Sequence, residues 1–234
     1  MEFGALNLLP AEPMMQQALG LSGAMVIEPK GATWVADPGD RTQAWVMGTV
    51  GWFREAVLAF QNGLLMTLSD ATQQQFCASP VAVNYQSAPL SLRQGSCPSW
   101  ASTDMSDALS NTLVGGADPT SPIVLAAPGL PLRIRLLNPG GTNQNEIFTL
   151  SGHVWEEEPY VRGSTELGSN PTSNQFGALA GQGPGNHMDV VLPSAGGRFA
   201  VQGDYLYRTF DAQDLPPGQW GVVRVKDGIT APPR

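Results

Sequence analysis

The stretch PGLPLRIRLLNPGG, residues 128–141, is the part of the sequence that indicates the fold most clearly. Between two turn-forming Pro-Gly pairs, LRIRLLN alternates apolar and polar residues with a period of two, which predicts a half-buried β-strand. The run IVLAA, residues 123–127, predicts a second strand just before it, because the PGLP turn separates the two. The sequence therefore predicts two consecutive strands at this point.

Similar short runs occur along the rest of the chain. Strands are predicted in GAMVIEP (23–29), CASPVAVNYQSAPLSLR (77–93), IFTLSGHVW (147–155), MDVVLP (188–193), GRFAVQGDYLYR (197–208) and WGVVRVKDG (220–228). Residues 45–66 suit either a strand or a helix, and 106–113 allow one or two helical turns. Residues 162–186, rich in Gly, Ser, Asn and Gln, predict a long loop. The pattern is typical of an all-β sandwich or barrel with long loops and a short helix.

Composition limits the classes of partner. The 234 residues include 27 Gly and 20 Pro, only 14% are charged, and the formal net charge is −8. An acidic surface repels nucleic acid and anionic lipid, so neither is an expected partner. No apolar run is long enough for a membrane span, and residues 1–29 lack the basic and apolar regions of a signal peptide.

Cys77 and Cys97 are the two cysteines, and they lie in a segment rich in Ser, Gln and Pro. In an exported protein we expect them to form a disulfide, which would contribute about 3 kcal/mol through the entropy of the unfolded chain. The alternative is a pair of free thiols in a reducing compartment.

The order of six segments resembles the multicopper oxidases, in particular a terminal cupredoxin domain of the large bacterial type. The segments are GLSGAMVIEPKGATW (20–34), FREAVLAFQNG (53–63), VNYQSAPLSLR (83–93), PGLPLRIRLLNPGG (128–141), FTLSGHVW (148–155) and GDYLYRTFDAQDLPPGQWGVVRV (203–225). The resemblance implies a cupredoxin-like Greek-key β-sandwich or barrel over residues 31–234. It also implies that residues 1–30 correspond to the closing strand of a preceding cupredoxin domain.

The same resemblance assigns positions to copper ligands, which in that family are mainly imidazole and thiolate groups. A His-Pro-x-His-x-His pattern before Gly152-His153 would place ligands at the positions of Glu146, Thr149 and Ser151. A His-Cys-His pattern, a later His and an axial Met would fall on the positions of Arg208, Thr209, Phe210, Asp214 and Gln219. None of these eight residues is a histidine or cysteine, and His153 matches the trailing histidine, which is not one of the ligands in that pattern. We therefore expect no copper and no other cofactor.

The two histidines, His153 and His187, are expected to be a structural residue near a strand end and a solvent-facing turn residue, respectively. A blue-copper set made from them with Met188 and a cysteine lacks the required convergence from one loop.

Three hypotheses for function follow. The first is a copper-free, degenerate cupredoxin domain that acts as a structural or interaction subunit of an extracytoplasmic assembly, in the periplasm, at the cell surface or secreted. The second is one part of a multicopper oxidase whose ligands come mainly from another chain or a missing N-terminal region. The third is a ligand-binding module that uses residues 162–186 and nearby tryptophans.

Residues 1–29 also predict an interaction. A strand at 23–29 with an open edge and apolar neighbours must be covered, either by this chain's own sandwich or by a sheet of another chain. Contact with a protein partner or a second copy is the favoured of the two.

Overall fold

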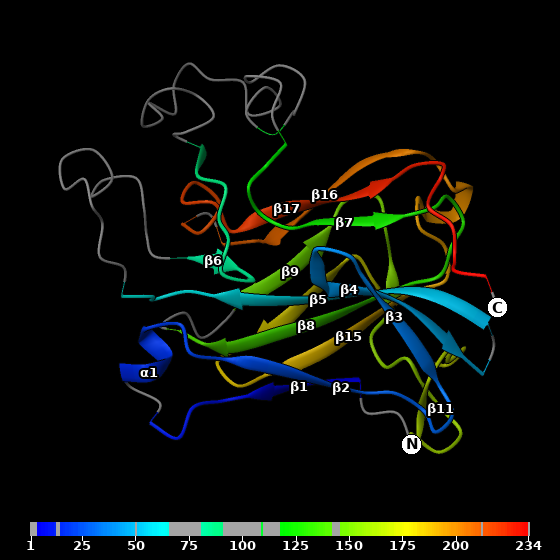
Figure 1. Cartoon of the computed structure of the whole chain (residues 1–234), viewed down its shortest axis with the longest axis horizontal. Helices are drawn as coiled ribbons and strands as arrows, with labels where there is room; N and C mark the ends of the chain where they lie inside the picture. The colour runs from blue at the N-terminus through cyan, green and yellow to red at the C-terminus, as the bar shows by residue number, and fades with distance from the viewer. Residues whose placement is uncertain are drawn as a thin grey trace.

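The computed structural model describes residues 4–12, 15–49, 51–65, 81–90, 109, 118–141, 146–211 and 213–233. In these residues the chain is nearly all β, with two main sheets that pack face to face (Figure 1). Cys77 and Cys97 lie outside the described residues. So does the helix expected at 106–113, apart from Leu109.

The first sheet has the strand order β15-β8-β5-β4-β3, and β6 pairs with β5. Its strands are β3 (Thr33–Asp37), β4 (Asp40–Gly48), β5 (Gly51–Gln61), β6 (Ala82–Val83), β8 (Leu132–Gly140) and β15 (His187–Leu192). Strand β5 lies parallel to β8 and antiparallel to β4. The sequence left residues 45–66 undecided between strand and helix. Where they are described they form strands, except for the turn at Thr49 and the irregular end after Gln61.

The second sheet has the order β14-β9-β16-β17-β7. Its strands are β7 (Ile123–Ala126), β9 (Glu146–Leu150), β14 (Ala178–Gln182), β16 (Gly203–Thr209) and β17 (Trp220–Val225). The chain alternates between the sheets, because β7, β9, β14 and β16 belong to the second and β8 and β15 to the first. The predicted strand at 197–208 begins later than expected, since 3₁₀ helix η2 (Gly197–Phe199) precedes β16.

The core lies between the two sheets. Alternate residues of β8, including Leu132 and Ile134, are fully buried there. The rings of Phe60 and Phe148 meet edge-on at 5.9 Å, and those of Phe60 and Tyr207 at 6.2 Å. Full burial of an apolar side chain of this size contributes about 1.5–3 kcal/mol. These contacts join β5 to β9 and β16, so they fix how the sheets face each other.

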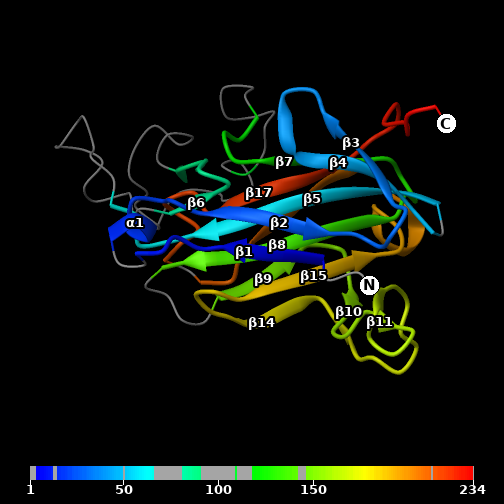
Figure 2. The same cartoon turned by 60° about the horizontal axis from the view of Figure 1, so that its bottom comes forward.

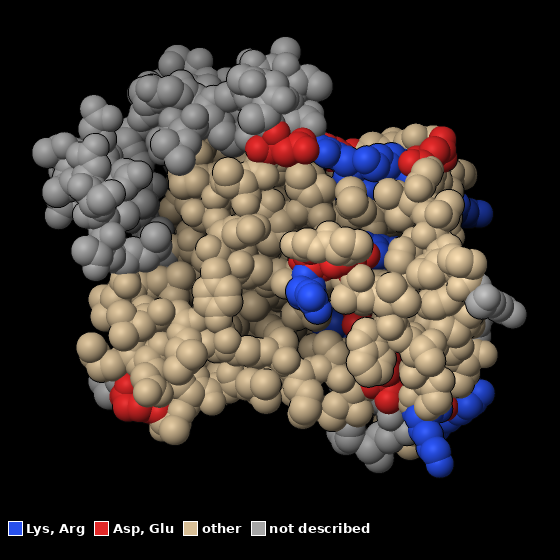
Figure 3. Space-filling model, viewed as in Figure 1, with Lys and Arg blue, Asp and Glu red and all other residues tan. Residues whose placement is uncertain are grey.

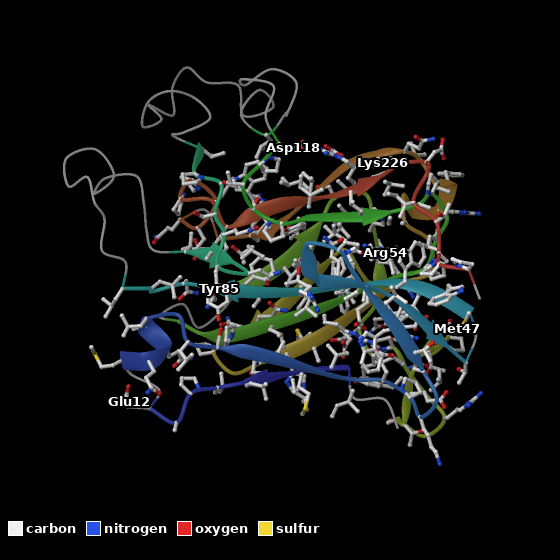
Figure 4. The ribbon with its side chains drawn as sticks, viewed as in Figure 1. Glu12, Met47, Arg54, Tyr85, Asp118 and Lys226 are labelled. Carbon is white, nitrogen blue, oxygen red and sulfur yellow. The ribbon has the colours of Figure 1, made fainter. Side chains whose placement is uncertain are left out.

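One arginine also lies inside the sandwich. Arg54 of β5 is 2% exposed and donates to both carboxylate oxygens of Asp37 at 2.8 and 2.7 Å (Figure 4). Its Nε donates to the carbonyl of Leu125 at 2.9 Å. The guanidinium therefore links the first sheet to β7 of the second, and its charge is neutralised by a bidentate partner.

The N-terminal hairpin covers the outer face of the first sheet. Strands β1 (Gly4–Leu8) and β2 (Gly23–Ile27) pair antiparallel and lie over β8 and β15 (Figure 2). Helix α1 (Met15–Ala18) lies between them, and Glu12 accepts from two backbone N–H groups of its first turn. The strand at 23–29 was expected to be covered either by this chain's own sandwich or by a sheet of another chain. In the structure it lies on the chain's own sandwich.

A buried ion cluster holds this hairpin in place. Arg135 of β8 is fully buried and bonds Glu55 and Asp189, each at 2.8 Å, and also Glu28, which directly follows β2. Burial, together with a hydrogen bond and charge repulsion from Glu55, raises the pKa of Glu28 to about 7. The prediction that β8 is half-buried is wrong, because the hairpin and this cluster cover its outer face and all nine residues are buried.

The prediction of a long loop at 162–186 is also wrong. It contains β12 (Glu166–Leu167), β13 (Gln175–Phe176) and β14. Strand β12 pairs with β11 (Tyr160–Val161), and β13 pairs with β10 (Trp155–Glu156). Strands β10 and β11 lie beyond the end of β15 (Figure 2). Strands β12 and β13 have two residues each and leave no periodic signal in a sequence, and the five residues of β14, ALAGQ, do not alternate apolar and polar residues over their length.

Candidate functional site

Strands β9 and β16 carry four of the eight positions that the resemblance assigns to copper ligands. The two pair antiparallel, with Thr149 opposite Arg208. Since successive side chains of a strand face opposite sides, Glu146 and Thr209 face the interior and are 0% exposed. Thr149 and Arg208 face outward and are half-buried. The eight positions therefore divide into two groups on opposite faces of one sheet.

The interior group consists of Glu146, Thr209, Asp214 and Gln219, all buried. The hydroxyl of Thr209 donates to Oε1 of Gln219 at 3.2 Å. The amide nitrogen of Gln219 in turn donates to the carbonyl of Gln61 at 3.1 Å, which connects this group to the end of β5. These four buried residues come from strand β9, strand β16 and the turn before β17.

Glu146 is the chemically unusual member of the interior group. The side-chain amide of Asn62 donates to its Oε1, while its Oε2 has no hydrogen-bond partner among the described residues. Burial raises its pKa to about 7, opposed by the Asn62 hydrogen bond and reinforced by the negative charges of Asp214 and Asp211. This carboxyl group therefore gains or loses a proton close to neutral pH.

The interior group does not fit copper of the kind that the resemblance implies. Its donor atoms are two carboxylates, a hydroxyl and an amide, whereas such a site needs imidazole and thiolate ligands. The hydroxyl and the amide are also engaged with each other. No step of a copper reaction can be assigned to these residues.

The exterior group consists of Thr149, Ser151, Arg208 and Phe210. The hydroxyl of Thr149 donates to the backbone carbonyl of Arg208 at 3.2 Å, and Ser151 is exposed. The guanidinium carbon of Arg208 lies 5.4 Å from the ring centroid of Phe210, which is 61% exposed. The outer face thus presents an arginine and an aromatic ring where the resemblance places copper ligands.

His153 has a structural role, in agreement with the prediction from sequence. Its Nδ1 lies 2.9 Å from the carbonyl of Ser151. Its Nε2 accepts from the backbone N–H groups of Gly196 and Gly197 at 3.1 and 3.2 Å. The ring edge packs against Tyr205 at 4.7 Å, and burial lowers the pKa of the imidazole. Because both nitrogens bond the backbone, neither is available to a metal.

His187 is the first residue of β15 and is exposed, as expected for a solvent-facing histidine. In the described part of the chain, no three His, Cys, Asp or Glu side chains are grouped so that they could hold a metal ion. Within the same residues, no helix has the length and apolar character that a membrane crossing needs.

A cavity of about 760 Å³ lies at the other end of β9, next to His153. We call it the Trp52 cavity, and its wall includes Trp52, Phe53, Arg133, Trp155, Gln175 and Arg198. The sequence pointed to residues 162–186 and nearby tryptophans as a possible ligand site, and Gly168, Ser169 and Gln175 do line it. It missed the two arginines, because they belong to segments that are distant in the sequence.

Comparisons with known proteins give the class of fold. No protein-family model matches the chain, and no curated protein matches it in sequence. Among solved structures, a multicopper oxidase is similar with a TM-score of 0.51 at 16% identity, over 97% of this chain and 57% of its own. A copper nitrite reductase from Nitrosomonas europaea gives 0.51 at 18% identity, over 96% and 63%. The laccase from Botrytis aclada gives 0.52 at 17% identity, over 99% and 36%.

The chain therefore has the cupredoxin-like β-sandwich fold found in multicopper oxidases, as the sequence resemblance predicted. It spans between 36% and 63% of the length of these three structures. At such identities the likeness establishes the fold and leaves the activity open.

Proposed function

We propose that this protein is a copper-free cupredoxin-fold domain that acts as a structural or interaction subunit of an extracytoplasmic assembly. The observation that carries the proposal is the interior group. Glu146, Thr209, Asp214 and Gln219 are all buried, Thr209 bonds Gln219, Gln219 bonds the backbone of Gln61, and Glu146 accepts from Asn62. Such a network stabilises a strand end and offers copper no imidazole or thiolate.

The surface around α1 supports the interaction part of the proposal. Its exposed apolar side chains come from α1, the hairpin and the neighbouring segments, and they are Leu8, Leu9, Met15, Leu19, Leu21, Met25, Leu65 and Tyr85. In the view of Figure 3 no Lys or Arg of the described residues lies over α1, and Glu12 marks its acidic edge (Figure 4). Exposed apolar side chains gathered around one element are typical of protein contacts. We propose another protein domain as the partner.

Metal analysis of the protein from its natural source, in its native assembly, tests the copper-free part. We expect no stoichiometric copper and no intense thiolate-to-copper absorption. Stoichiometric copper in the assembly would favour the alternative, in which the chain is part of a multicopper oxidase and a partner supplies the ligands. That alternative draws support from the exposed exterior group and from the 36–63% of the neighbours' length that this chain spans.

Association is tested with surface variants that leave the core intact. Met15, Leu19 and Leu21 are 59%, 65% and 56% exposed, so changing all three to Ser should not unfold the chain. We expect native mass spectrometry and light scattering to show loss of the assembly. The matched control is Phe199→Ser with Val201→Ser, two exposed apolar residues at the end of η2 and just after it. Equal assembly of both variants would refute this surface as the interface.

A further inference from the structure

The Trp52 cavity lies between the first sheet and the β10–β13 pair. One wall comes from the beginnings of β5 and β8 and the end of β15, and the opposite wall from residues 152–156, 168, 169 and 175. Its volume of about 760 Å³ falls within the range of about 300–1,000 Å³ that small-molecule sites occupy. The cavity is therefore large enough for a ligand of two or three fused rings.

The wall of the cavity includes Trp52, Phe53 and Trp155. Trp155 is 1% exposed and Phe53 is 3% exposed, so the fold holds both rings firmly. Trp52 is half-buried and meets Trp45 edge-on at 6.5 Å, which fixes the orientation of its indole. Since Trp155 and Phe53 present little surface, the half-buried indole of Trp52 is the main aromatic surface open to a ligand, and it favours a planar ligand that packs against it.

The charged side chains of the wall favour an anionic ligand. Two guanidinium groups, Arg133 and Arg198, line the cavity beside one carboxylate, Glu156. The two oxygens of Glu156 already accept from the hydroxyl of Ser169 at 3.1 Å and from the backbone of Asn170 at 2.6 Å.

The two arginines differ in how they are held. Arg133 is 4.0 Å from the ring centroid of Phe53 and 3.8 Å from Glu28. Arg198 is exposed and has no carboxylate partner among the described residues. In a chain with a net charge of −8, this is an uncompensated positive group at an aromatic cavity. A carboxylate could accept its hydrogen bonds in pairs.

We propose that the Trp52 cavity binds a planar aromatic carboxylate, with the ring system packed against Trp52 and the apolar wall and the carboxylate at Arg198. The site is separate from the interior group, because Glu146 begins β9 whereas the cavity starts beyond its other end, at Gly152. Binding here is therefore independent of whether the fold carries copper. A neutral sugar would also pack against tryptophan, but the predominantly apolar wall and the unpaired arginine favour the aromatic acid.

Isothermal titration of the full chain with 2-naphthoate tests the proposal, with 2-naphthamide as the neutral analogue and cellobiose as the sugar probe. We expect one naphthoate per chain and binding at least about tenfold weaker for naphthamide, as expected when one charge-assisted hydrogen bond is lost. Arg198→Gln should weaken naphthoate binding about tenfold and leave naphthamide unchanged. The matched control Arg41→Gln changes an exposed arginine that does not line the cavity and should leave both affinities unchanged.

Trp52→Leu keeps the wall apolar but removes a flat ring, so it should weaken both naphthyl ligands to a similar degree. Three results would overturn the proposal: no saturable naphthoate binding, binding of cellobiose in its place, or equal effects of Arg198→Gln and Arg41→Gln. Circular dichroism of each variant shows whether it is folded, so that loss of binding can be assigned to the cavity.

Discussion

Replacing Glu146 with Gln should change how the stability of the protein depends on pH. The carboxyl group is 0% exposed, and its pKa rises from an ordinary value of 4.5 to about 7. Because the folded state holds the proton more tightly than the unfolded state does, the resulting stabilisation is complete below pH 4.5. It is lost as the pH rises through about 7.

The magnitude follows from the two pKa values. A gap from 4.5 to about 7 corresponds to about 3 kcal/mol at 1.36 kcal/mol for each pH unit. Glutamine keeps an oxygen that can accept from Asn62 but has no proton to lose. Relative to the wild type, the Glu146→Gln variant should therefore gain about 3 kcal/mol between pH 4.5 and pH 8.

Urea denaturation followed by tryptophan fluorescence at pH 4.5, 6, 7 and 8 measures this difference. The comparison is made between variant and wild type at each pH, so contributions of Glu28 and His153 cancel. Glu157→Gln, at an exposed position, supplies the baseline. A difference that stays constant between pH 4.5 and 8, or a variant that becomes less stable as the pH rises, would refute the reasoning.

Three further predictions concern the ion cluster, the structural histidine and the cysteines. Arg135→Met leaves Glu28, Glu55 and Asp189 without their shared cation and should cost about 3–5 kcal/mol in the free energy of unfolding, measured against exposed Arg162→Met. His153→Ala removes the acceptor of two backbone N–H groups and should cost about 2 kcal/mol. Because burial lowers the imidazole pKa, the unfolded chain binds this proton more tightly, and the wild type loses stability as the pH falls below 6.5. The His153→Ala variant should not show this loss. Mass spectrometry without reductant should find Cys77 joined to Cys97 in native material, and free thiols would contradict an exported protein.

The resemblance assigned the eight copper-ligand positions, and strand periodicity predicts how those on strands divide between the two faces of a sheet. Once the strands at 146–150 and 203–209 are placed, the period of two determines that Glu146 and Thr209 face one side and Thr149 and Arg208 the other. The convergence of Asp214 and Gln219 on the same place came from the resemblance, because no local pattern indicates it.

Other features depend on contacts between distant segments, and the sequence could not supply them. The alternation in LRIRLLN predicts one polar face, but the hairpin at residues 4–27 covers that face and buries Arg135. The Trp52 cavity joins Phe53, Arg133 and Arg198, which come from β5, β8 and the η2 turn. Only the folded chain brings these three side chains together.

The central claim is that the fold still places the former copper-ligand positions close together although the ligands are absent. Copper binding by a variant with restored ligands tests this claim most directly. The variant combines Glu146→His, Thr209→Cys and Asp214→His, and Thr209→Cys alone is the control. We expect about one copper per chain and an intense thiolate-to-copper band in the triple variant. The wild type and the single variant should show neither. A folded triple variant that binds no copper, or a wild type that binds it stoichiometrically, would contradict this account.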